Sequence, residues 1–458
     1  MTGRCLLLFL FFIIFMFDCA GQSRVLMDDT GRNHLPYSFL SPLKKVWIPE
    51  KYVRKKEFRG FWISTVGNLD FPRCKNAAGF RAAYTRLIRN AAAAGFNAVI
   101  FQVRPCGDAF YPSKYNPWSR YLSGKEGFPL EPGFDPLTFM IAEAHRYGLE
   151  FHAWLNPYRV IGYTKLTKSA YLRTLHPANF AVKHPDKVLS VPLKNGGNML
   201  FFNPGDPDVL MYLIHSIQEL LRYTPDAIHI DDYFYPYEPM GNQDLHTFQR
   251  YAQKGMTIDA FRRYSTDRLV QSIFLLIKRY NALMKTQIKF GISPFGIWAN
   301  KPRPKPKFPD AIEQWKKLQT SPDGSETKGH QSYFELYADT RKWVKNGWVD
   351  YIVPQIYWGF SNPAASYASV VDWWVNNVRG TNVTLYIGVG VYRMGVNSDC
   401  LRQDELANQL RYIQKYPEVK GVSFFSGRSI FQTPPPARKI MLKHIFETYW
   451  GGKYNTEK

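Results

Sequence analysis

From Phe58 onward, short apolar runs of strand-like composition alternate with stretches of helical periodicity, and the alternation occurs eight times. The runs that predict strands are residues 58–66, 98–104, 149–156, 227–232, 289–297, 350–358, 385–393 and 421–426. The stretches that predict helices are residues 80–94, 136–147, 207–223, 259–284, 333–346, 367–378, 403–416 and 437–449. Strands that alternate with helices indicate right-handed crossovers and a parallel sheet.

Eight such units predict an α/β fold, a (β/α)8 TIM barrel with long βα loops. A doubly wound open sheet is less consistent with the sequence, because no G-x-G-x-x-G follows the first strand and polar residues end all eight strands. We divide the chain into a signal peptide at 1–21, a linker or wrapping arm at 22–57, the barrel at 58–450 and a tail at 451–458. The connections at 105–135, 157–203 and 299–331 are long, and we expect them to shape a binding site.

The first 21 residues are typical of an export signal. Arg4 precedes an apolar stretch that is shorter than the roughly 20 residues of a spanning helix, so we expect no integral membrane span. Cys19 raises the alternative of a lipid anchor, although Asp18 before it fits that signal poorly. We therefore expect an exported protein of the periplasm or outer cell envelope. The three later cysteines, Cys74, Cys106 and Cys400, allow at most one disulfide and match no zinc-site spacing.

The formal net charge of +22 favours polyanionic partners. Most lysines and arginines are scattered along the predicted helices, and one basic run lies at 301–307. No nucleic-acid-binding motif accompanies them, so we expect no nucleic acid partner. For an exported protein, an acidic cell-wall glycan is the more natural partner.

The fourth predicted strand ends in two adjacent carboxylates, Asp231 and Asp232, followed by the aromatic run Tyr233-Phe234-Tyr235-Pro236. An unpaired buried carboxylate costs several kcal/mol, so a core strand has no structural use for this pair. At the carboxyl end of a barrel strand the pair would enter the active-site mouth. The structural alternative is that one aspartate caps the following turn.

The other strands end in polar and aromatic residues that suit sugar binding. Amide and guanidinium groups bond hydroxyls in fixed geometry, and aromatic faces take the apolar faces of the ring. The candidates for substrate binding are Trp62, Arg104, Asp108, Asn156, Tyr158, Arg159, Tyr233, Trp298, Gln355, Tyr357, Trp358 and Arg393. Trp154 is a further stacking candidate, and one or two of the tryptophans are expected in the core.

The sequence lacks the residues that two other kinds of enzyme would need. Phosphoryl transfer would require a Gly-rich anion cradle, which the sequence does not contain. A zinc hydrolase, such as a metal-dependent polysaccharide deacetylase, would require histidines at the strand ends. His152 and His229 lie inside their strands, where core histidines are the more common interpretation. We therefore expect neither a metal nor a cofactor.

Several motifs carry a resemblance to a known family. The segments at 59–72, 101–105, 108–111, 154–159, 229–236 and 354–358 resemble the glycosyl-hydrolase-like family 10 proteins. The resemblance runs from about Phe58 to about Tyr449. It implies an exported TIM-barrel glycosidase, and bacterial members of the family act on peptidoglycan strands stripped of their stem peptides. The expected function is therefore hydrolysis of glycosidic bonds in a bacterial envelope polysaccharide.

Most glycosidases use two carboxyl groups, and Asp231 and Asp232 are the first candidates, with Asp70, Asp108 and Glu238 behind them. Like charges close together raise one pKa, so one aspartate is a candidate general acid, and we rank Asp232 slightly above Asp231. A substrate 2-acetamido group could instead attack the anomeric carbon, with Tyr357 bonding that group. A retaining, inverting or substrate-assisted course remains open.

The arginines at the strand ends have two interpretations. Arg104, Arg159 or Arg393 could bind the lactyl carboxylate of an N-acetylmuramyl unit, or each could pair with a neighbouring aspartate. An alternative for the whole protein is a catalytically inactive envelope glycan-binding barrel, because stacking aromatics and charge would look the same.

Overall fold

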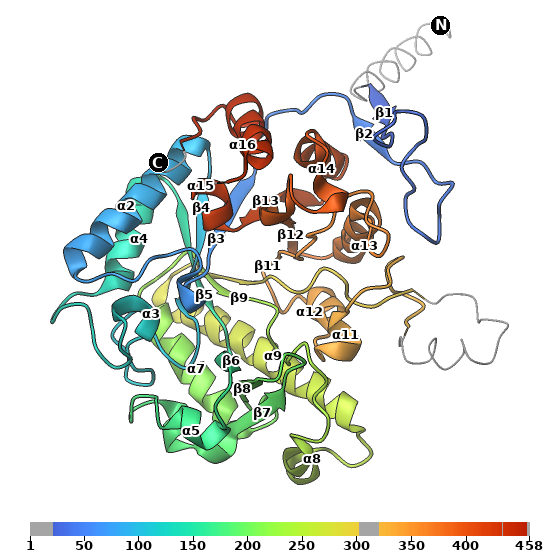
Figure 1. Cartoon of the computed structure of the whole chain (residues 1–458). Helices are drawn as coiled ribbons and strands as arrows, with labels where there is room; N and C mark the ends of the chain where they lie inside the picture. Colours follow the sequence, from blue (N-terminus) through green and yellow to red (C-terminus); the bar gives the residue numbers. More distant parts are fainter. Residues whose placement is uncertain (1–21, 302–319, 433, 456–458) are drawn as a thin grey trace, which may run out of the picture.

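Eight parallel strands close into a barrel, and the carboxyl end of each leads toward an outer helix (Figure 1). The computed structural model describes residues 22–301, 320–432 and 434–455. The strands are paired in chain order and are β3 (Phe58–Ile63), β4 (Ala98–Arg104), β5 (Glu150–Leu155), β9 (Ala227–Ile230), β10 (Lys289–Ile292), β11 (Tyr351–Ile352), β12 (Thr384–Gly390) and β13 (Val419–Phe425). β13 pairs with β3 and closes the ring. The predicted (β/α)8 TIM barrel is confirmed.

The outer helices surround this barrel (Figure 1). They are α2 (Ala77–Ala94), α4 (Pro136–Arg146), α7 (Pro207–Leu221), α9 (Ile258–Met284), α12 (Thr340–Lys345), α13 (Tyr367–Val378), α14 (Glu405–Ile413) and α16 (Pro436–Lys443). Local signals explain their ends: Asn76 caps α2 by accepting from the Gly79 N–H, and Gly95 ends it in the left-handed region at φ 95°. The side chains of Asp135 and Asp206 cap α4 and α7 in the same way.

Two barrel strands are much shorter than predicted. The runs at 289–297 and 350–358 were expected to be strands throughout, but β10 ends at Ile292 and β11 at Ile352. Pro294 and Pro354 lie just beyond, and proline has no N–H to continue the ladder. Apolar composition continues past both prolines, but there Phe295 and Gln355 form only an isolated bridge.

The barrel interior is filled by aromatic and imidazole rings. A cluster that includes Trp62, Trp154 and Tyr351 packs there, and the Tyr351 phenol contacts Nδ1 of His152 at 2.8 Å and Nδ1 of His229 at 3.0 Å. Both histidines are therefore core residues, as expected. Burial lowers the pKa of His229 well below its ordinary value, which keeps it neutral. Gly291 is required, because a Cβ there would lie 1.9 Å from the Tyr351 ring.

The connection at 157–203 has more structure than its sequence indicates. It holds an antiparallel sheet in the order β6–β8–β7 and two short helices beside α7 (Figure 1). These elements are β6 (Arg159–Thr164), β7 (Val188–Pro192), β8 (Asn198–Phe202), α5 (Lys168–Leu172) and α6 (Phe180–Lys183). The sequence gives little sign of these elements, because strands of only five or six residues give a weak periodic signal. The remaining short α-helices are α3 (Arg120–Ser123), α8 (Leu245–Tyr251), α11 (Ser332–Glu335) and α15 (Gly427–Phe431).

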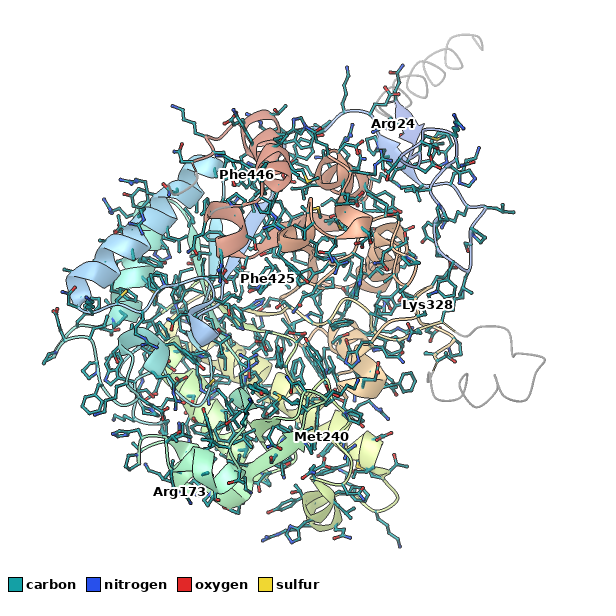
Figure 2. All side chains as sticks on the ribbon, in the orientation of Figure 1. Arg24, Arg173, Met240, Lys328, Phe425 and Phe446 are labelled. Carbon is teal, nitrogen blue, oxygen red and sulfur yellow. The ribbon has the colours of Figure 1, made fainter. Side chains whose placement is uncertain are left out.

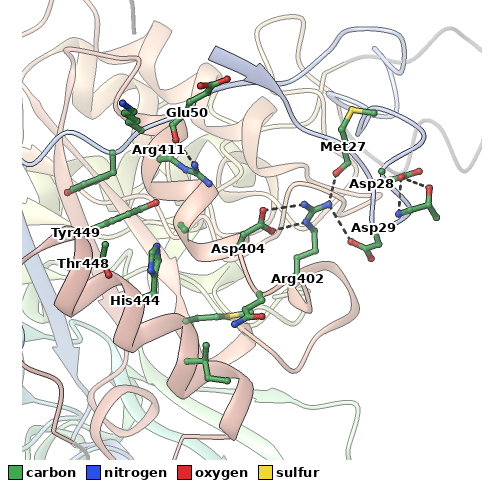
Figure 3. A pocket seen from close by; sticks show the side chains of 18 residues that line it. Met27, Asp28, Asp29, Glu50, Arg402, Asp404, Arg411, His444, Thr448 and Tyr449 are labelled. Carbon is green, nitrogen blue, oxygen red and sulfur yellow. Dashed lines mark hydrogen bonds and ion pairs between the residues drawn. The ribbon is translucent and has the colours of Figure 1, made fainter. Parts of the chain in front are cut away.

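The segment at 22–57 packs along the barrel's outer side. Its strands β1 (Ser23–Val25) and β2 (Trp47–Pro49) pair antiparallel, and Leu26 and Ile48 are fully buried. Arg402 ties the segment to the start of α14 by contacting Asp29 at 3.4 Å as well as Asp404 at 3.1 Å (Figure 3). A cavity of about 1160 Å³ lies between this segment and the last helices.

Some expectations concern residues outside the described ranges: the signal segment with Cys19, most of the basic run at 301–307, and the last three residues of the tail. The three later cysteines are all buried and free, so no disulfide joins them. Within the described ranges, no helix is both long and apolar enough to span a membrane.

Candidate active site

Asp231 and Asp232 follow the last residue of β9 directly, and both are buried in the barrel mouth. Three groups donate to Asp231: the indole of Trp154 at 3.1 Å, the side-chain amide of Asn156 at 3.0 Å from each oxygen, and the Tyr233 backbone N–H at 3.2 Å. Trp154 and Asn156 stand at the end of β5, which pairs with β9. Because every partner is an N–H donor, the site matches an ionised carboxylate at Asp231.

Asp232 contacts residues on the other side of the mouth. The phenol of Tyr237 donates to its Oδ2, and the Gln355 amide at the end of β11 also bonds it. That amide is oriented by donating to the Ser293 carbonyl at 2.9 Å. Burial, and then the negative charge of Asp231, raise the pKa of Asp232 to about 6. A carboxyl with a pKa near 6 is still partly protonated near neutral pH, so it can act as a general acid.

The pKa of Asp231 is raised above its ordinary value by burial, but the polar groups that contact it favour the ionised form. Burial raises the pKa of this carboxyl, whereas the nearby charge of Arg159 and the donors from Asn156, Tyr233 and Trp154 lower it. The Arg159 guanidinium lies over the Tyr233 ring, 4.3 Å from its centroid. Its backbone N–H donates to the Asn156 side-chain oxygen at 2.8 Å. The two adjacent carboxyls are thus held in different environments, one suited to a carboxylate and one suited to an acid.

Arg104 lies beneath this site instead of facing a ligand. Its guanidinium donates to the Asn156 carbonyl at 2.7 Å, the Asn116 side chain at 3.0 Å and the Tyr212 phenol at 2.9 Å. Arg104 is 0% exposed, so the prediction that it binds substrate was wrong. A register shift between Gln102 and Arg104 places it at the end of β4. Arg104 therefore orders the backbone that carries Asn156.

Aromatic side chains form part of the mouth. Tyr357 is half-buried, its ring lies 5.8 Å from that of Phe425, and burial followed by the charge of Asp232 raises its pKa well above the ordinary value. A neutral phenol beside Asp232 can donate to a substrate oxygen. Trp358 is half-buried and packs edge-on against Phe295, at 5.7 Å between centroids. These rings offer apolar faces beside the carboxyls.

Three of the predicted sugar-binding aromatics lie elsewhere. Trp62 is in the barrel interior, where its indole donates to Nε2 of His229 at 3.4 Å. Trp298 lies in the outer layer, stacked 5.6 Å from Trp373 and bonded to Asp339 at 3.0 Å. Tyr158 is 2% exposed within the main core. Their packing explains the correction, because a ring enclosed by core residues has no free face for a sugar.

Two predicted polar ligands have structural partners. Asp108 is buried in its loop and accepts from the Ser119 hydroxyl at 2.6 Å and the Cys106 N–H at 3.0 Å. Burial, with the charge of Glu126, raises the pKa of Asp108 to about 6. Arg393 forms an ion pair with Asp399 at 2.9 Å, which is the paired alternative weighed for the arginines. The structure brings together Asn156, Arg159, Tyr233, Gln355, Tyr357 and Trp358 around the two aspartates.

Sequence reasoning missed Tyr237, the phenol that bonds Asp232. It lies in the same aromatic run as Tyr233 and Tyr235, so its position was a usable signal. Its ring is 40% exposed and packs against Phe295 and His330 at 6.2 and 5.3 Å between centroids. In the part of the chain that the structure describes, no three His, Cys, Asp or Glu side chains are grouped so that they could hold a metal ion.

Comparisons with known proteins identify a family and several relatives of this chain. Residues 57–404 match the family described as Glycosyl hydrolase-like 10. Glycosyl hydrolase YngK of Bacillus subtilis (strain 168) is 40% identical over 389 residues, which cover 83% of this chain and 70% of YngK. Glycosyl hydrolase DigH of Escherichia coli (strain K12) is 34% identical over 417 residues, which cover 86% of this chain and 87% of DigH.

A crystal structure of an alpha-amylase from Lactobacillus plantarum aligns with a TM-score of 0.42 at 11% identity, over 84% of this chain and 74% of that one. The family match spans most of the barrel, and YngK and DigH share a third or more of the aligned residues. The chain therefore belongs to the glycosyl hydrolase-like 10 family.

Proposed function

We propose that this protein hydrolyses glycosidic bonds in an acidic envelope polysaccharide, and that its substrate is the peptide-free glycan strands of peptidoglycan. The observation that carries the proposal is the pair of adjacent buried carboxyls, Asp231 and Asp232, held in different environments beside aromatic rings. Membership of the family supports glycosidic chemistry. The choice of glycan rests on the sequence resemblance and on the net charge of +22.

Asp232 serves as the general acid in this proposal. Its proton is transferred to the glycosidic oxygen as the bond from that oxygen to the anomeric carbon breaks. The departing sugar leaves as an alcohol, and Asp232 becomes a carboxylate. Tyr237 and Gln355 stabilise that carboxylate because both are placed to donate to it. In the second step, Asp232 takes a proton from the attacking water and is restored.

Asp231 stabilises positive charge at the anomeric carbon. Its lone pairs are already occupied by N–H donors from Trp154, Asn156 and Tyr233, which disfavours it as a nucleophile. The nucleophile in this proposal is the carbonyl oxygen of the substrate's 2-acetamido group. That oxygen bonds to the anomeric carbon, and water later displaces it. Tyr357 is placed beside Asp232 to donate to the acetamido group.

The remaining strand-end carboxylates support this substrate-assisted course. Asp70 and Asp108 each accept from groups of the protein, and both are buried. Neither offers a second free carboxylate beside Asp232. A mechanism with one protein acid and help from the substrate therefore accounts for the arrangement with the fewest additional groups.

The proposed location is outside the cytoplasm, in the periplasm or outer envelope. It is supported by the apolar segment at 1–21 and by the fit between a basic protein and an acidic wall polymer. Ordinary cleavage near Gly21 and a lipid anchor at Cys19 make different products. Cell fractionation followed by the intact mass of the mature protein distinguishes them, since an acylated Cys19 would add lipid mass.

Incubation of the purified protein with peptide-free and peptide-bearing peptidoglycan tests the activity. We expect soluble oligosaccharides, identified by mass, from the peptide-free strands and little from the peptide-bearing ones. The Asp232→Asn protein is the control and should release none. Binding without any product from either substrate would favour the inactive glycan-binding barrel.

A thiazoline analogue of the sugar tests the mechanism. It resembles the cyclic intermediate of an acetamido-assisted reaction, so we expect it to inhibit. A strand whose 2-acetamido groups have been removed should not be cleaved. Cleavage of that strand at the normal rate would contradict the substrate-assisted course and leave glycosidase activity standing.

A further inference from the structure

A second cavity opens beside the proposed active site, on the far side of Tyr237. Its volume is about 490 Å³, and its lining comes from the loop at 237–239 after β9 and the segment at 328–337 after β10. Lys328 and Met240, labelled in Figure 2, mark these two loops. Because both loops follow the carboxyl ends of neighbouring strands, the cavity lies on the same face of the barrel as Asp231 and Asp232.

Tyr237 belongs to both the cavity and the active site. Its hydroxyl donates to Asp232, while its ring forms part of the cavity wall. Phe334 and Tyr337 add two more half-buried rings to the lining. A chain of sugar units bound at Asp232 would therefore have an adjoining space lined by aromatic faces. The volume falls within the roughly 300–1,000 Å³ range of small-molecule sites.

His330, one of the lining residues, has a ring nitrogen without a hydrogen-bond partner among the described residues. Nδ1 of His330 contacts Glu335 at 3.1 Å, whereas Nε2 is buried and has no hydrogen-bond partner among the described residues. The imidazole packs edge-on against Tyr237 and Phe295, at 5.3 and 5.5 Å between centroids. If Glu335 holds the proton-bearing nitrogen, Nε2 is a hydrogen-bond acceptor. Because this nitrogen is closed to solvent, the imidazole takes part in the lining through the rest of its ring.

The segment that carries His330 is held in place by its neighbours. Asn300 donates from its side chain to the Gly329 carbonyl at 2.9 Å and accepts from the Thr327 hydroxyl at 2.8 Å. A Cβ at Gly329 would lie 2.8 Å from the end of the Ile297 side chain, so the loop packs closely against that residue. The cavity is therefore preorganised, which lowers the cost of binding.

The charges of the lining favour a neutral ligand. Glu335 and Glu238 are carboxylates, and Lys194 contacts Glu238 at 3.8 Å from outside the lining. Lys328 is the ammonium in the lining and lies 5.2 Å from the Phe39 ring centroid. Two carboxylates are well suited to accept from sugar hydroxyls and would repel a third carboxylate.

We propose that this cavity is a second sugar subsite, which binds a neutral pyranose unit next to the bond being cleaved. The inference rests on the proposed glycosidase function and deepens it. Tyr237 separates this unit from the one at Asp232, and the imidazole of His330 forms part of the wall that the bound unit contacts. The uncharged 2-acetamido sugar of an alternating strand fits here, and the carboxylate-bearing sugar does not. His330 is thus a specificity-determining residue that favours longer strands.

The test compares peptide-free peptidoglycan fragments of increasing length: disaccharide, tetrasaccharide and hexasaccharide. For the unmodified protein, kcat/KM should rise steeply once the fragment is long enough to fill both sites. His330→Ala should lower kcat/KM for the hexasaccharide about tenfold and change that for the disaccharide little. His246→Ala is the matched control, because His246 is exposed on α8. An unchanged dependence on length in His330→Ala would overturn the subsite.

A binding measurement separates this inference from the proposed function. Calorimetric titration of Asp232→Asn with the hexasaccharide, with and without His330→Ala, needs no turnover. If no fragment is cleaved but His330→Ala weakens hexasaccharide binding, the glycosidase function fails and the sugar site stands. If binding is equal in both proteins, the subsite is refuted whether or not cleavage occurs. Thermal melting of each variant checks that the fold is retained.

Discussion

Two parts of the barrel rim carry buried aspartates at strand ends, and their surroundings differ. At the seam between β3 and β13, Asp70 accepts from the backbone N–H groups of Ser64 at 2.8 Å and Arg428 at 2.9 Å, and from the Ser426 hydroxyl at 2.5 Å. At the end of β9, Asp231 accepts mainly from the side chains of Trp154 and Asn156. Both carboxyls are at most 3% exposed.

The comparison shows that burial alone does not identify a catalytic carboxylate. Asp70 accepts hydrogen bonds from backbone donors on both sides of the seam, so it links the first strand to the last. The β9 pair is surrounded by side chains from β5 and β11 and by aromatic rings, and the like charge of its neighbour helps to raise the pKa of Asp232. The type of donor and the presence of a charged neighbour separate the structural aspartate from the catalytic pair.

The sharpest test of this contrast is turnover. We expect Asp232→Asn and Asp231→Asn each to reduce turnover of peptide-free strands at least a hundredfold, because an amide can neither donate the proton nor stabilise positive charge. Asp70→Asn is the control, and its folded fraction should keep turnover within a few-fold of normal. Initial rates normalised to folded protein provide the measurement. Near-normal turnover in both β9 variants would contradict the assignment.

The free energy of unfolding should change in the reverse order, with the larger loss in Asp70→Asn. Asp70→Asn should lower the free energy of unfolding by about 2 kcal/mol, because either orientation of the amide leaves a buried backbone N–H facing an NH₂ group. Asp232→Asn should preserve or raise stability at neutral pH. Folding raises the pKa of Asp232 from 3.8 to about 6, so its ionisation costs the folded state up to about 3 kcal/mol as pH rises through that window. Urea unfolding at low and neutral pH measures both effects.

The pH dependence of turnover sharpens the role of Asp232. A general acid must be protonated, so kcat/KM should fall about tenfold per pH unit above a limb near pH 6. Tyr237→Phe removes a hydrogen bond that lowers this pKa, and the limb should move to higher pH. Tyr392→Phe is a matched control, because the Tyr392 ring lies in the same mouth, 5.9 Å from that of Tyr357. A limb that stays in place in Tyr237→Phe would show that this phenol does not govern the acid.

A smaller effect is expected from the positioning residue Asn156. Asn156→Ala removes the amide that donates to both oxygens of Asp231, so turnover should fall about tenfold. Asn376→Ala, on the exposed side of α13, is the control. Because Asn156 acts through Asp231, the double variant with Asp231→Asn should be no slower than Asp231→Asn alone. An additive loss would indicate an independent role for Asn156.

Salt should have the mildest effect. Added salt screens the +22 charge, so binding of acidic strands should weaken and KM should rise, with kcat nearly constant. The buried pair at β9 is less accessible to ions than the surface. An uncharged glycan of the same length is the control and should bind equally at low and high salt. Equal salt response of both glycans would mean that the basic surplus does not act in substrate binding.

The sequence alone determined the eightfold order of strands and helices and the position of Asp231 and Asp232 at a strand end. Those features depend on local periodicity and on residues adjacent in the chain. It also indicated Asn156 and Gln355, because polar residues directly after apolar runs reach the same rim of a parallel barrel.

Only the tertiary structure decided which polar and aromatic candidates face the mouth. Arg104 donates to the Asn156 carbonyl, Arg393 forms an ion pair with Asp399, and Trp298 packs against Trp373. Each of these partners is brought by another loop or helix, and one sequence carries no direct signal for contacts between distant segments. The cavity at Tyr237 and His330 could not be predicted for the same reason. Its walls come from segments about ninety residues apart, which meet because β9 and β10 are neighbours.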